Sequence, residues 1–245
     1  MPNGSTGPLG GVFRPPQAPQ QARRVNRPAE YARPMDIGKL RRNYETGRLR
    51  KIDLDPDPLV QFGLWLEEAL QSGQLEPTAM TLATADGEGR PSARMVLLKG
   101  HGPAGFTFFS NYGSRKAQEA AANPFGALVF WWDRLERQVR AEGRLVRLGR
   151  EESLAYFRSR PRGSQLSTWA SPQSRPLETR DELLCSFEAA ELRFRGGEVP
   201  MPESWGGYRL EPVAVELWQG RADRLHDRFR YTLRDTTWEL VRLAP

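Results

Sequence analysis

Basic side chains gather in four short stretches of the sequence, three of which also contain hydroxyl or amide side chains. These stretches are Arg94–Lys99, Ser110–Lys116, Tyr156–Ser164 and Trp218–Phe229. Arginine and lysine make their strongest hydrogen bonds to anionic oxygens, and serine, tyrosine and asparagine add neutral donors. Each stretch is therefore a candidate site for a phosphate or another anion.

The first two stretches place cations at the ends of predicted elements. Strand alternation over RMVLLK puts Arg94 on one face and Lys99 on the other. Because Arg94 begins this apolar strand and Lys99 ends it, both side chains could contact one phosphate from the ends of the strand. Arg115 and Lys116 follow Ser114, the predicted N-cap of a helix, where free N–H groups and the helix dipole favour an anion. The alternatives are a core strand bounded by solvated cations and an exposed basic turn.

In the third stretch the donors surround a loop shaped by Pro161 and Gly163; they are Tyr156, Arg160, Arg162 and Ser164. The alternative is a solvated helix end.

In the fourth stretch, strand alternation is expected to place Arg224, His226 and Arg228 on one face, with Trp218 nearby. Two neighbouring arginines should lower the pKa of His226 and favour its neutral form.

Other kinds of site are not indicated. The sequence contains no P-loop, no GxGxxG after a strand, no GxSxG elbow and no HExxH. Cys185 is the single cysteine, and His101 and His226 are the two histidines. This inventory rules out a disulfide within the chain and a multi-cysteine metal site, and we expect no metal.

The basic excess is the strongest compositional signal. Lys and Arg number 36 against 30 Asp and Glu, for a net charge of +6, and only four of the 36 are lysines. A basic chain is typical of nucleic-acid binding, whereas an arginine bias equally suits small anions gripped by two hydrogen bonds. Five arginines against two acids fall in residues 1–38, so half of the net charge lies there.

Residues 1–38 are predicted to form a disordered tail rich in Arg, Pro and Gly, because they bury too little apolar surface to offset ordering. The alternative is a transit peptide, although the prolines would break its amphipathic helix. No apolar signal region and no run of about 18 apolar residues occurs, so we expect a cytoplasmic protein with no membrane contact.

The rest of the chain, residues 39–245, is predicted to form one domain. Asp57 and Pro58 begin a helix that Gly73 closes, and further helices are expected over 115–122, 151–158 and 180–194. Strands are expected over 79–85, 91–99, 106–110, 126–132, 138–148, 208–219, 227–234 and 238–242. Strands without βαβ alternation predict an α+β fold built on an antiparallel barrel.

Read together, the motifs resemble the pyridoxine (pyridoxamine) 5′-phosphate oxidase family. The matching stretches are RRNYETGRLR (41–50), PTAM (77–80), RMVLLK (94–99), FFSNYGSRKA (108–117), LERQVR (135–140), YFRSRPRGSQ (156–165), WASPQS (169–174), GEVPMPESWGGYRL (197–210), WQGRADRLHDRF (218–229) and RLAP (242–245). They run in unbroken order from roughly residue 40 to the end. SRPRGSQ and RLHDRF are the most specific, because neither is a general strand pattern.

The resemblance implies a homodimer of split-barrel subunits with FMN at the interface. It implies oxidation of pyridoxamine or pyridoxine 5′-phosphate to pyridoxal 5′-phosphate, with O₂ reduced to hydrogen peroxide and ammonia released from the amine. A flavin oxidase for another aromatic substrate is the nearer alternative. A nucleic-acid-binding module is the more distant one, and we expect no specific nucleic-acid partner.

Carried over residue by residue, the resemblance also implies the site. FMN contacts are expected from Arg94, Met95, Val96, Leu97, Leu98, Lys99, Phe109, Ser110, Arg115, Lys116, Gln138, Gln173, Ser174, Trp218 and Arg228. Substrate contacts are expected from Arg41, Arg42, Asn43, Tyr44, Lys99, Tyr156, Arg160, Ser164, Arg224, Leu225 and His226. Arg224 and His226 are the expected catalytic pair. Phe109 stands where many relatives have tyrosine, so its contact should be apolar or through the backbone.

Overall fold

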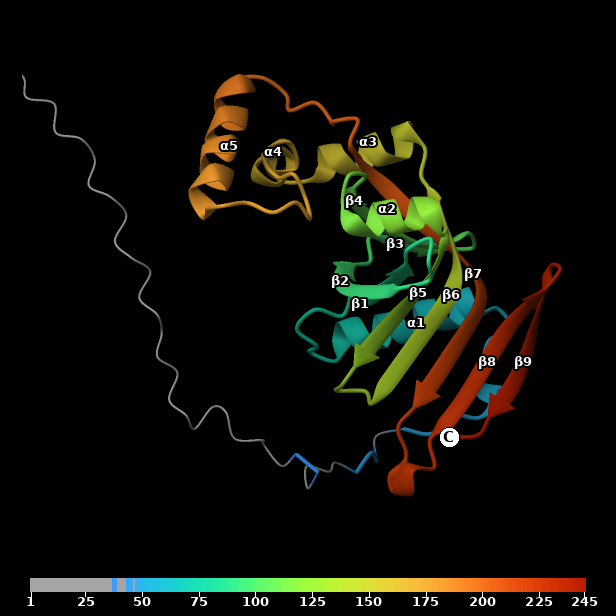
Figure 1. Ribbon diagram of the computed structural model, residues 1–245. Helices are drawn as coiled ribbons and strands as arrows, with labels where there is room; N and C mark the ends of the chain where they lie inside the picture. The colour runs from blue at the N-terminus through green and yellow to red at the C-terminus, as the bar shows by residue number, and fades with distance from the viewer. Residues whose placement is uncertain (1–36, 39–42, 46) are drawn as a thin grey trace, which may run out of the picture. The chain divides into compact units, whose positions relative to one another are not determined.

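The computed structural model describes residues 37–38, 43–45 and 47–245 (Figure 1). Residues 43–245 form one compact unit, and every helix and strand of the described chain belongs to it. The predicted tail, apart from Ile37 and Gly38, lies outside the described residues, as do the predicted substrate contacts Arg41 and Arg42.

The unit combines strands with helices, and all but two of these elements were predicted from the sequence. The strands are β1 (Ala79–Ala85), β2 (Pro91–Leu97), β3 (Gly100–Gly102), β4 (Gly105–Asn111), β5 (Phe125–Trp132), β6 (Arg137–Arg147), β7 (Trp205–Gln219), β8 (Asp227–Arg234) and β9 (Thr237–Leu243). The helices are α1 (Pro58–Gln71), α2 (Arg115–Ala122), α3 (Arg150–Ser159), α4 (Arg162–Ala170) and α5 (Arg180–Arg193), with short 3₁₀ turns η2 (Lys51–Asp53) and η3 (Ala222–Arg224). The predicted α+β class is confirmed.

The strands form one antiparallel sheet that curls back on itself. Its order is β2-β1-β5-β6-β7-β4-β3, so β2 and β3 stand at opposite ends of the path. Only Leu98 and Lys99 separate these two strands in the sequence, and the Lys99 N–H donates to the carbonyl of Thr107 on β4 at 2.8 Å. The chain therefore passes directly from one end of the sheet path to the other through Lys99, as the curl of the sheet requires.

Strand β7 changes partners along its length. Its first part pairs with β4 as far as Leu210, and its last part pairs with β8 from Ala214 onward, while β6 pairs along both. Pro212, which lacks an N–H donor, falls between the two pairings. A bulge opposite it requires Gly143, where a Cβ would lie 2.0 Å from the carbonyl oxygen of Glu211. This switch leads the chain out of the barrel into the β8–β9 hairpin.

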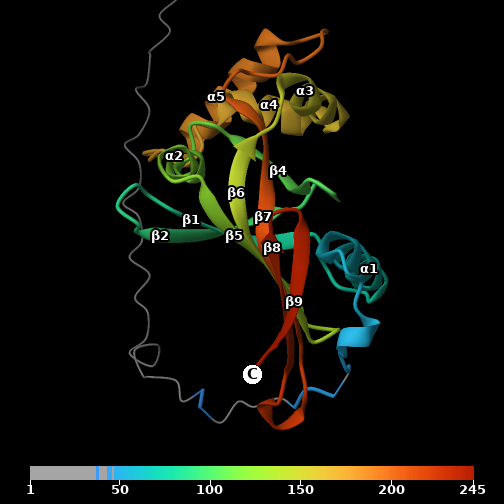
Figure 2. The same ribbon diagram turned by 90° about the vertical axis from the view of Figure 1, so that its right-hand side faces the viewer.

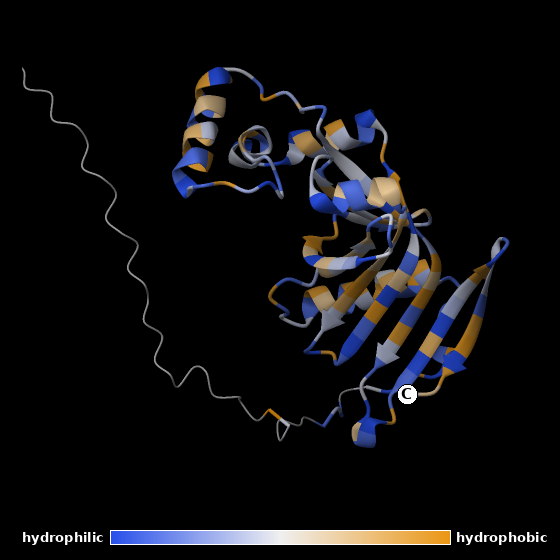
Figure 3. Cartoon of the chain, in the orientation of Figure 1, coloured by the Kyte–Doolittle hydropathy of each residue, from blue (hydrophilic) through white to orange (hydrophobic). Residues whose placement is uncertain are grey.

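Helix α1 supplies the aromatic centre of the barrel core. Asp57 accepts a hydrogen bond from the Leu59 N–H at 2.8 Å and Pro58 takes the first helical position, as the sequence predicts. Phe62 on α1 is fully buried, with its ring centroid 4.8 Å from that of Phe106 and 4.9 Å from that of Phe130. Figure 3 shows hydrophobic and hydrophilic residues alternating along the strands. Because successive side chains of a strand point to opposite faces of the sheet, the hydrophobic residues pack on its inner face.

A second, smaller core joins helices α3, α4 and α5. Phe157, Leu166, Ala190 and Trp205 are among its buried members, so it links the three helices to the first residue of β7. Figures 1 and 2 show these helices at one end of the sheet and the turn between β7 and β8 at the other. Among the described residues, no helix has the length and apolar character needed to cross a membrane.

Most predicted ranges agree with the structure to within three residues, and two elements were missed. Strand β3 has only three residues, two of them glycine, and carries no apolar alternation. The sequence predicts a loop where α4 begins, because Pro161 and Gly163 are typical turn residues. Instead, Pro161 stands at its N-cap and the helix continues to Ala170. Proline is tolerated there because the first N–H groups of a helix have no partner within it.

Replacing Phe62 with alanine is expected to destabilise the fold by about 3–5 kcal/mol, because it removes a ring on which three aromatic neighbours pack. The measurement is urea-induced unfolding followed by fluorescence. Phe125→Ala is the control, since that ring is 59% exposed and should cost far less. Equal losses from the two substitutions would contradict the assigned core.

Candidate active site

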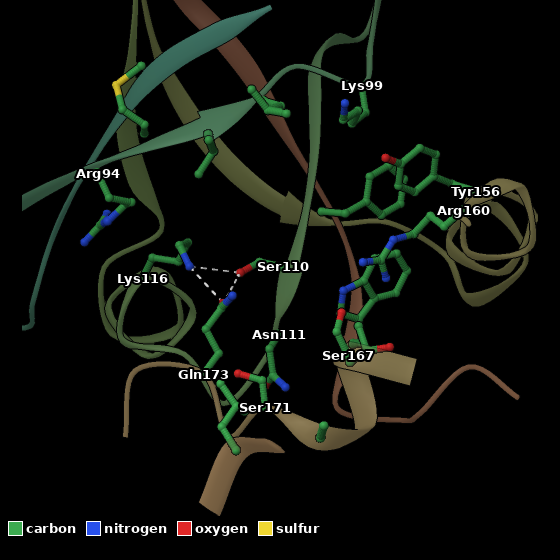
Figure 4. Close-up of a pocket in the computed structure, with 18 of the residues that line it drawn as sticks. Arg94, Lys99, Ser110, Asn111, Lys116, Tyr156, Arg160, Ser167, Ser171 and Gln173 are labelled. Carbon is green, nitrogen blue, oxygen red and sulfur yellow. Dashed lines mark hydrogen bonds between the residues drawn. The ribbon is translucent and has the colours of Figure 1, made fainter. Parts of the chain in front are cut away.

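A cleft of about 670 Å³ opens between the barrel and the helical cluster. It lies among β2, β4, α2 and the α3–α5 region, and its basic lining residues are Arg94, Lys99, Lys116 and Arg160 (Figure 4). The residues that line it include no aspartate or glutamate. A volume of this size is typical of small-molecule sites, and the charge selects for an anion.

One wall of the cleft is centred on Lys116. Its ammonium donates to Ser110 Oγ at 3.1 Å and to Gln173 Oε1 at 3.0 Å (Figure 4). It also donates to Ser114 Oγ at 3.4 Å. Burial, and then the charge of Arg94, lower the pKa of Lys116. All three acceptors are neutral, and the described residues offer this ammonium no carboxylate partner.

The loop positions around Lys116 are set by local geometry. Ser114 is the N-cap residue of α2, as predicted, but its side chain makes no capping hydrogen bond. Its hydroxyl is fully buried and lies 3.3 Å from Ser110 Oγ. Ser174 has φ +72°, a left-handed conformation that turns the chain directly after Gln173. Both loops thereby aim oxygen atoms at the lysine.

Glu119, one turn further along α2, organises the neighbouring arginines. It accepts from Arg94 Nη2 at 3.1 Å and from Arg115 Nε at 2.7 Å, and also from Ser92 and Thr84. Burial disfavours its charge, but these four hydrogen bonds outweigh burial and lower the pKa of Glu119 to about 2. Part of the positive charge predicted at this helix N-terminus is therefore balanced from within the chain.

The opposite wall is an aromatic stack that carries Arg160. The rings of Phe109 and Tyr156 lie nearly parallel with centroids 3.9 Å apart. The Arg160 guanidinium sits 4.8 Å from the ring of Trp205, and its buried Nη1 has no hydrogen-bond partner among the described residues. Burial lowers the pKa of Arg160 and raises that of Tyr156. Lys99 completes this side of the cleft (Figure 4).

Other predicted contacts fall in or near the same cleft. Met95, Val96 and Leu97 line it, whereas the Leu98 side chain is buried in the barrel core. Ser164 lies in the first turn of α4 and does not line the cleft. The residues of α4 that do line it are Ser167, Thr168 and Ala170, and Ser171 follows them. The serines and Thr168 were missed because the sequence did not predict α4.

A second group of predicted residues lies around the turn between β7 and β8. The ring of Trp218 lies 4.6 Å from His226 and 5.6 Å from Tyr44, centroid to centroid. The Arg221 N–H donates to His226 Nδ1 at 3.1 Å, so the neutral imidazole carries its proton on Nε2. Burial, and then the charge of Arg224, lower the pKa of His226, in the predicted direction.

The predicted strand alternation of Arg224, His226 and Arg228 is wrong. Strand β8 begins at Asp227, and Arg224 lies in η3 with φ +61°, next to Asp223 at +55°. Two consecutive left-handed residues that are not glycine store strain, which is typical of functional sites. Leu225, also a predicted contact, is 69% exposed.

Gln138 and Arg228 lie at the same end of the sheet. Gln138 faces Trp218 in the β6–β7 register, and Trp218 faces Arg228 in the β7–β8 register. Arg228 donates to the buried Glu216 at 2.9 Å and to the carbonyl of Ala244 at 2.9 Å. Its charge is therefore already balanced within the chain. Asn43, the remaining described contact, is exposed just before Tyr44.

The two groups are held apart by β7. Trp205 begins the strand at the cleft, and Trp218 lies thirteen residues further along. At about 3.3 Å per residue the strand path between them is about 40 Å. One chain therefore brings together the residues of the cleft and, separately, those around Trp218.

Comparisons with known proteins decide the family. A family model described as pyridoxamine 5′-phosphate oxidase matches residues 66–194, more than half of the chain. The chain belongs to the pyridoxamine 5′-phosphate oxidase family. A second model, described as the pyridoxine 5′-phosphate oxidase C-terminal dimerisation region, matches residues 205–245. The predicted resemblance and the predicted oxidoreductase class are confirmed.

Relatives match over nearly their whole length. A pyridoxine/pyridoxamine 5′-phosphate oxidase from Rubrobacter xylanophilus is 55% identical over 210 residues, covering 86% of this chain and 97% of the relative. One from Teredinibacter turnerae is 49% identical over 211 residues, covering 86% of this chain and all of the relative.

Solved structures confirm the split-barrel fold. PhzG from Burkholderia lata, in complex with tetrahydrophenazine-1-carboxylic acid, has a TM-score of 0.76 at 29% identity, over 81% of this chain and 98% of that one. A pyridoxamine 5′-phosphate oxidase-related, FMN binding protein from Nostoc punctiforme has a TM-score of 0.61 at 17% identity, over 74% and 95%, which supports the fold alone.

Glu119→Gln is expected to lower stability at pH 7 by at most about 3 kcal/mol, because the pKa of Glu119 falls from 4.5 to about 2 on folding. The contribution of this carboxylate is present above about pH 4.5 and is lost as the pH falls toward 2. The stability difference between wild type and variant should therefore shrink over that range in urea unfolding experiments. Glu67→Gln, at an exposed site, controls for the loss of one negative charge.

Proposed function

We propose that this protein is an FMN-dependent oxidase that converts pyridoxamine or pyridoxine 5′-phosphate to pyridoxal 5′-phosphate. One observation carries the proposal: the cleft holds cations on two separate walls and no acid among its lining residues. Two separated anion sites suit a cofactor and a substrate that each bear a phosphate. Membership of the family and the names of the relatives support the same reaction.

The Lys116 wall fits the phosphate of FMN. Lys116 has only neutral oxygens as partners among the described residues, and its lowered pKa reflects a buried charge without an anion. A bound phosphate would reverse that penalty. We assign the FMN phosphate to Lys116 and Ser110, with Arg94 and Arg115 held nearby by Glu119. Gln173 and the apolar residues of β2 would hold the rest of the cofactor.

The Arg160 wall fits the phosphate of the substrate. Its buried Nη1 has no acceptor within the described chain, which leaves a donor ready for an anionic oxygen. Lys99 and the Tyr156 hydroxyl lie on the same side of the cleft (Figure 4). We assign the substrate phosphate to these three residues. The contribution of Ser164 stays a prediction, as does a cytoplasmic location.

The residues around Trp218 would reach the cleft of a second copy. The strand path of about 40 Å along β7 keeps them from the cleft of their own chain. The matched dimerisation region, residues 205–245, contains Trp218, Arg224, His226 and Arg228. We propose a homodimer with FMN at its interface, in which each copy supplies Arg224 and His226 to the other's cleft.

The chemistry divides between cofactor and protein. FMN, when bound, supplies the oxidant that accepts a hydride from the substrate and returns the two electrons to O₂, which leaves as hydrogen peroxide. The alcohol becomes the aldehyde directly, whereas the amine also consumes one water and releases ammonia. The phosphate-binding residues orient the substrate ring. Arg224 favours its ionised phenolic oxygen, and the Nε2–H of His226 is available as a hydrogen-bond donor.

Purified protein reconstituted with FMN is expected to bleach its visible flavin band when pyridoxamine 5′-phosphate is added without oxygen. Air should restore the band and release one hydrogen peroxide per aldehyde. Unphosphorylated pyridoxamine is the matched control and should react poorly. Failure of the protein to bind FMN in any titration would contradict the proposal. Loading without bleaching would point to a flavin oxidase for another substrate.

If each active site is built from both copies, two inactive variants should regain activity when they form mixed dimers. Arg160→Ala damages the cleft and Arg224→Ala damages the residue supplied to the other copy. After unfolding and refolding an equal mixture, half of the dimers are mixed, and each mixed dimer has one undamaged site. Activity should therefore return to about one quarter of the wild-type value. No recovery in the mixture, with both variants folded and dimeric, would show that each chain builds its own site.

A further inference from the structure

The corner between α3 and α4 determines where Arg160 stands. Helix α3 ends at Ser159, and Arg160 is its C-cap, with the backbone turned to the extended region by the following Pro161. The last carbonyl groups of a helix have no partner inside the helix. The corner therefore depends on whatever donor reaches those carbonyls.

One side chain supplies that donor to several carbonyls at once. The Gln165 amide Nε2 lies 3.1 Å from the carbonyl oxygen of Phe157, 3.3 Å from that of Arg158 and 3.0 Å from that of Arg160. An amide group has two hydrogens, so the three acceptors share them. Gln165 sits on the first turns of α4 and thus ties that helix back to the end of α3.

Hydrogen bonds fix both the backbone N–H and the backbone carbonyl of Arg160. Its N–H donates to the Phe157 carbonyl at 3.2 Å, and its own carbonyl accepts from Gln165. Its guanidinium rests on the ring of Trp205 at 4.8 Å. Arg160 Nη1, which lacks a partner in the described chain, is therefore carried on a main chain that Gln165 keeps in place.

We propose that Gln165 is a positioning residue for the substrate phosphate, acting through the backbone of Arg160. The inference rests on the proposed function, because it assigns Arg160 to that phosphate. Gln165 itself does not line the cleft. Lys116, Ser110 and Gln173 form the other wall with their own hydrogen bonds, so the effect is confined to the substrate phosphate.

The test is Gln165→Leu, which keeps a side chain of similar size and removes the donor. In the FMN-loaded enzyme we expect KM for pyridoxamine 5′-phosphate to rise about tenfold, with kcat and the FMN dissociation constant within about twofold of wild type. Gln74→Leu is the matched control, because Gln74 donates to a single carbonyl, that of Trp131, away from the cleft. Its KM should not change.

A double-mutant cycle separates positioning from a general structural role. In the Arg160→Ala background, Gln165→Leu should raise KM no further, because the group it positions is gone. Unphosphorylated pyridoxamine should show the same kcat/KM with and without Gln165→Leu. Additive effects in the cycle, equal losses on both substrates, or a wild-type KM in Gln165→Leu would each overturn the inference.

A further measurement keeps this inference apart from the proposed function. Inorganic phosphate binding to the FMN-loaded protein, followed by calorimetry, should weaken about tenfold in Gln165→Leu whether or not the enzyme turns over pyridoxamine 5′-phosphate. Absence of turnover by wild type would overturn the proposed substrate. Equal phosphate affinity in wild type and Gln165→Leu would overturn the positioning role alone.

Discussion

The antiparallel ladder between β6 and β7 holds the barrel and the C-terminal hairpin on one rigid frame. It pairs Arg137 with Gln219 at one end and Arg147 with Tyr208 at the other, and its bulge at Gly143 lets β7 pass from β4 to β8. Because β7 cannot fold back on itself, Trp205 and Trp218 stay at opposite ends of it. The cleft, the strained Arg224 turn and the proposed need for a second copy all depend on that separation.

The cleft brings together positive charges that the chain balances only in part. Glu119 pairs with Arg94 and Arg115, so these two guanidinium groups keep fixed positions. Within the described chain, the hydrogen-bond partners of Lys116 are neutral, and the buried Nη1 of Arg160 has no hydrogen-bond partner. Burying unpaired cations costs free energy, and anionic ligands relieve that cost. A site built in this way suits the two phosphate groups that we propose for it, because its donors are already oriented.

Local sequence signals predicted most elements because they depend on near neighbours. The Asp57–Pro58 start of α1, the turn between β1 and β2, and the bounds of α2 all derive from residues a few positions apart. The misses have physical causes too. Pro161 and Gly163 concealed α4, and alternation could not foresee the left-handed turn at Arg224. Gln165 was overlooked as a positioning residue, because its role depends on a helix corner that only packing creates.

The sequence by itself determined the family, the antiparallel architecture and which charged side chains are candidates for phosphate binding, since residue types and short spacings encode these. Tertiary structure alone decided how those side chains are grouped. Lys99, Ser110 and Arg160 line one cleft, and Glu119 pairs with two arginines predicted to bind a ligand. Trp218 and His226 end up far from that cleft. Such groupings depend on sheet closure and strand register, which arise from long-range pairing.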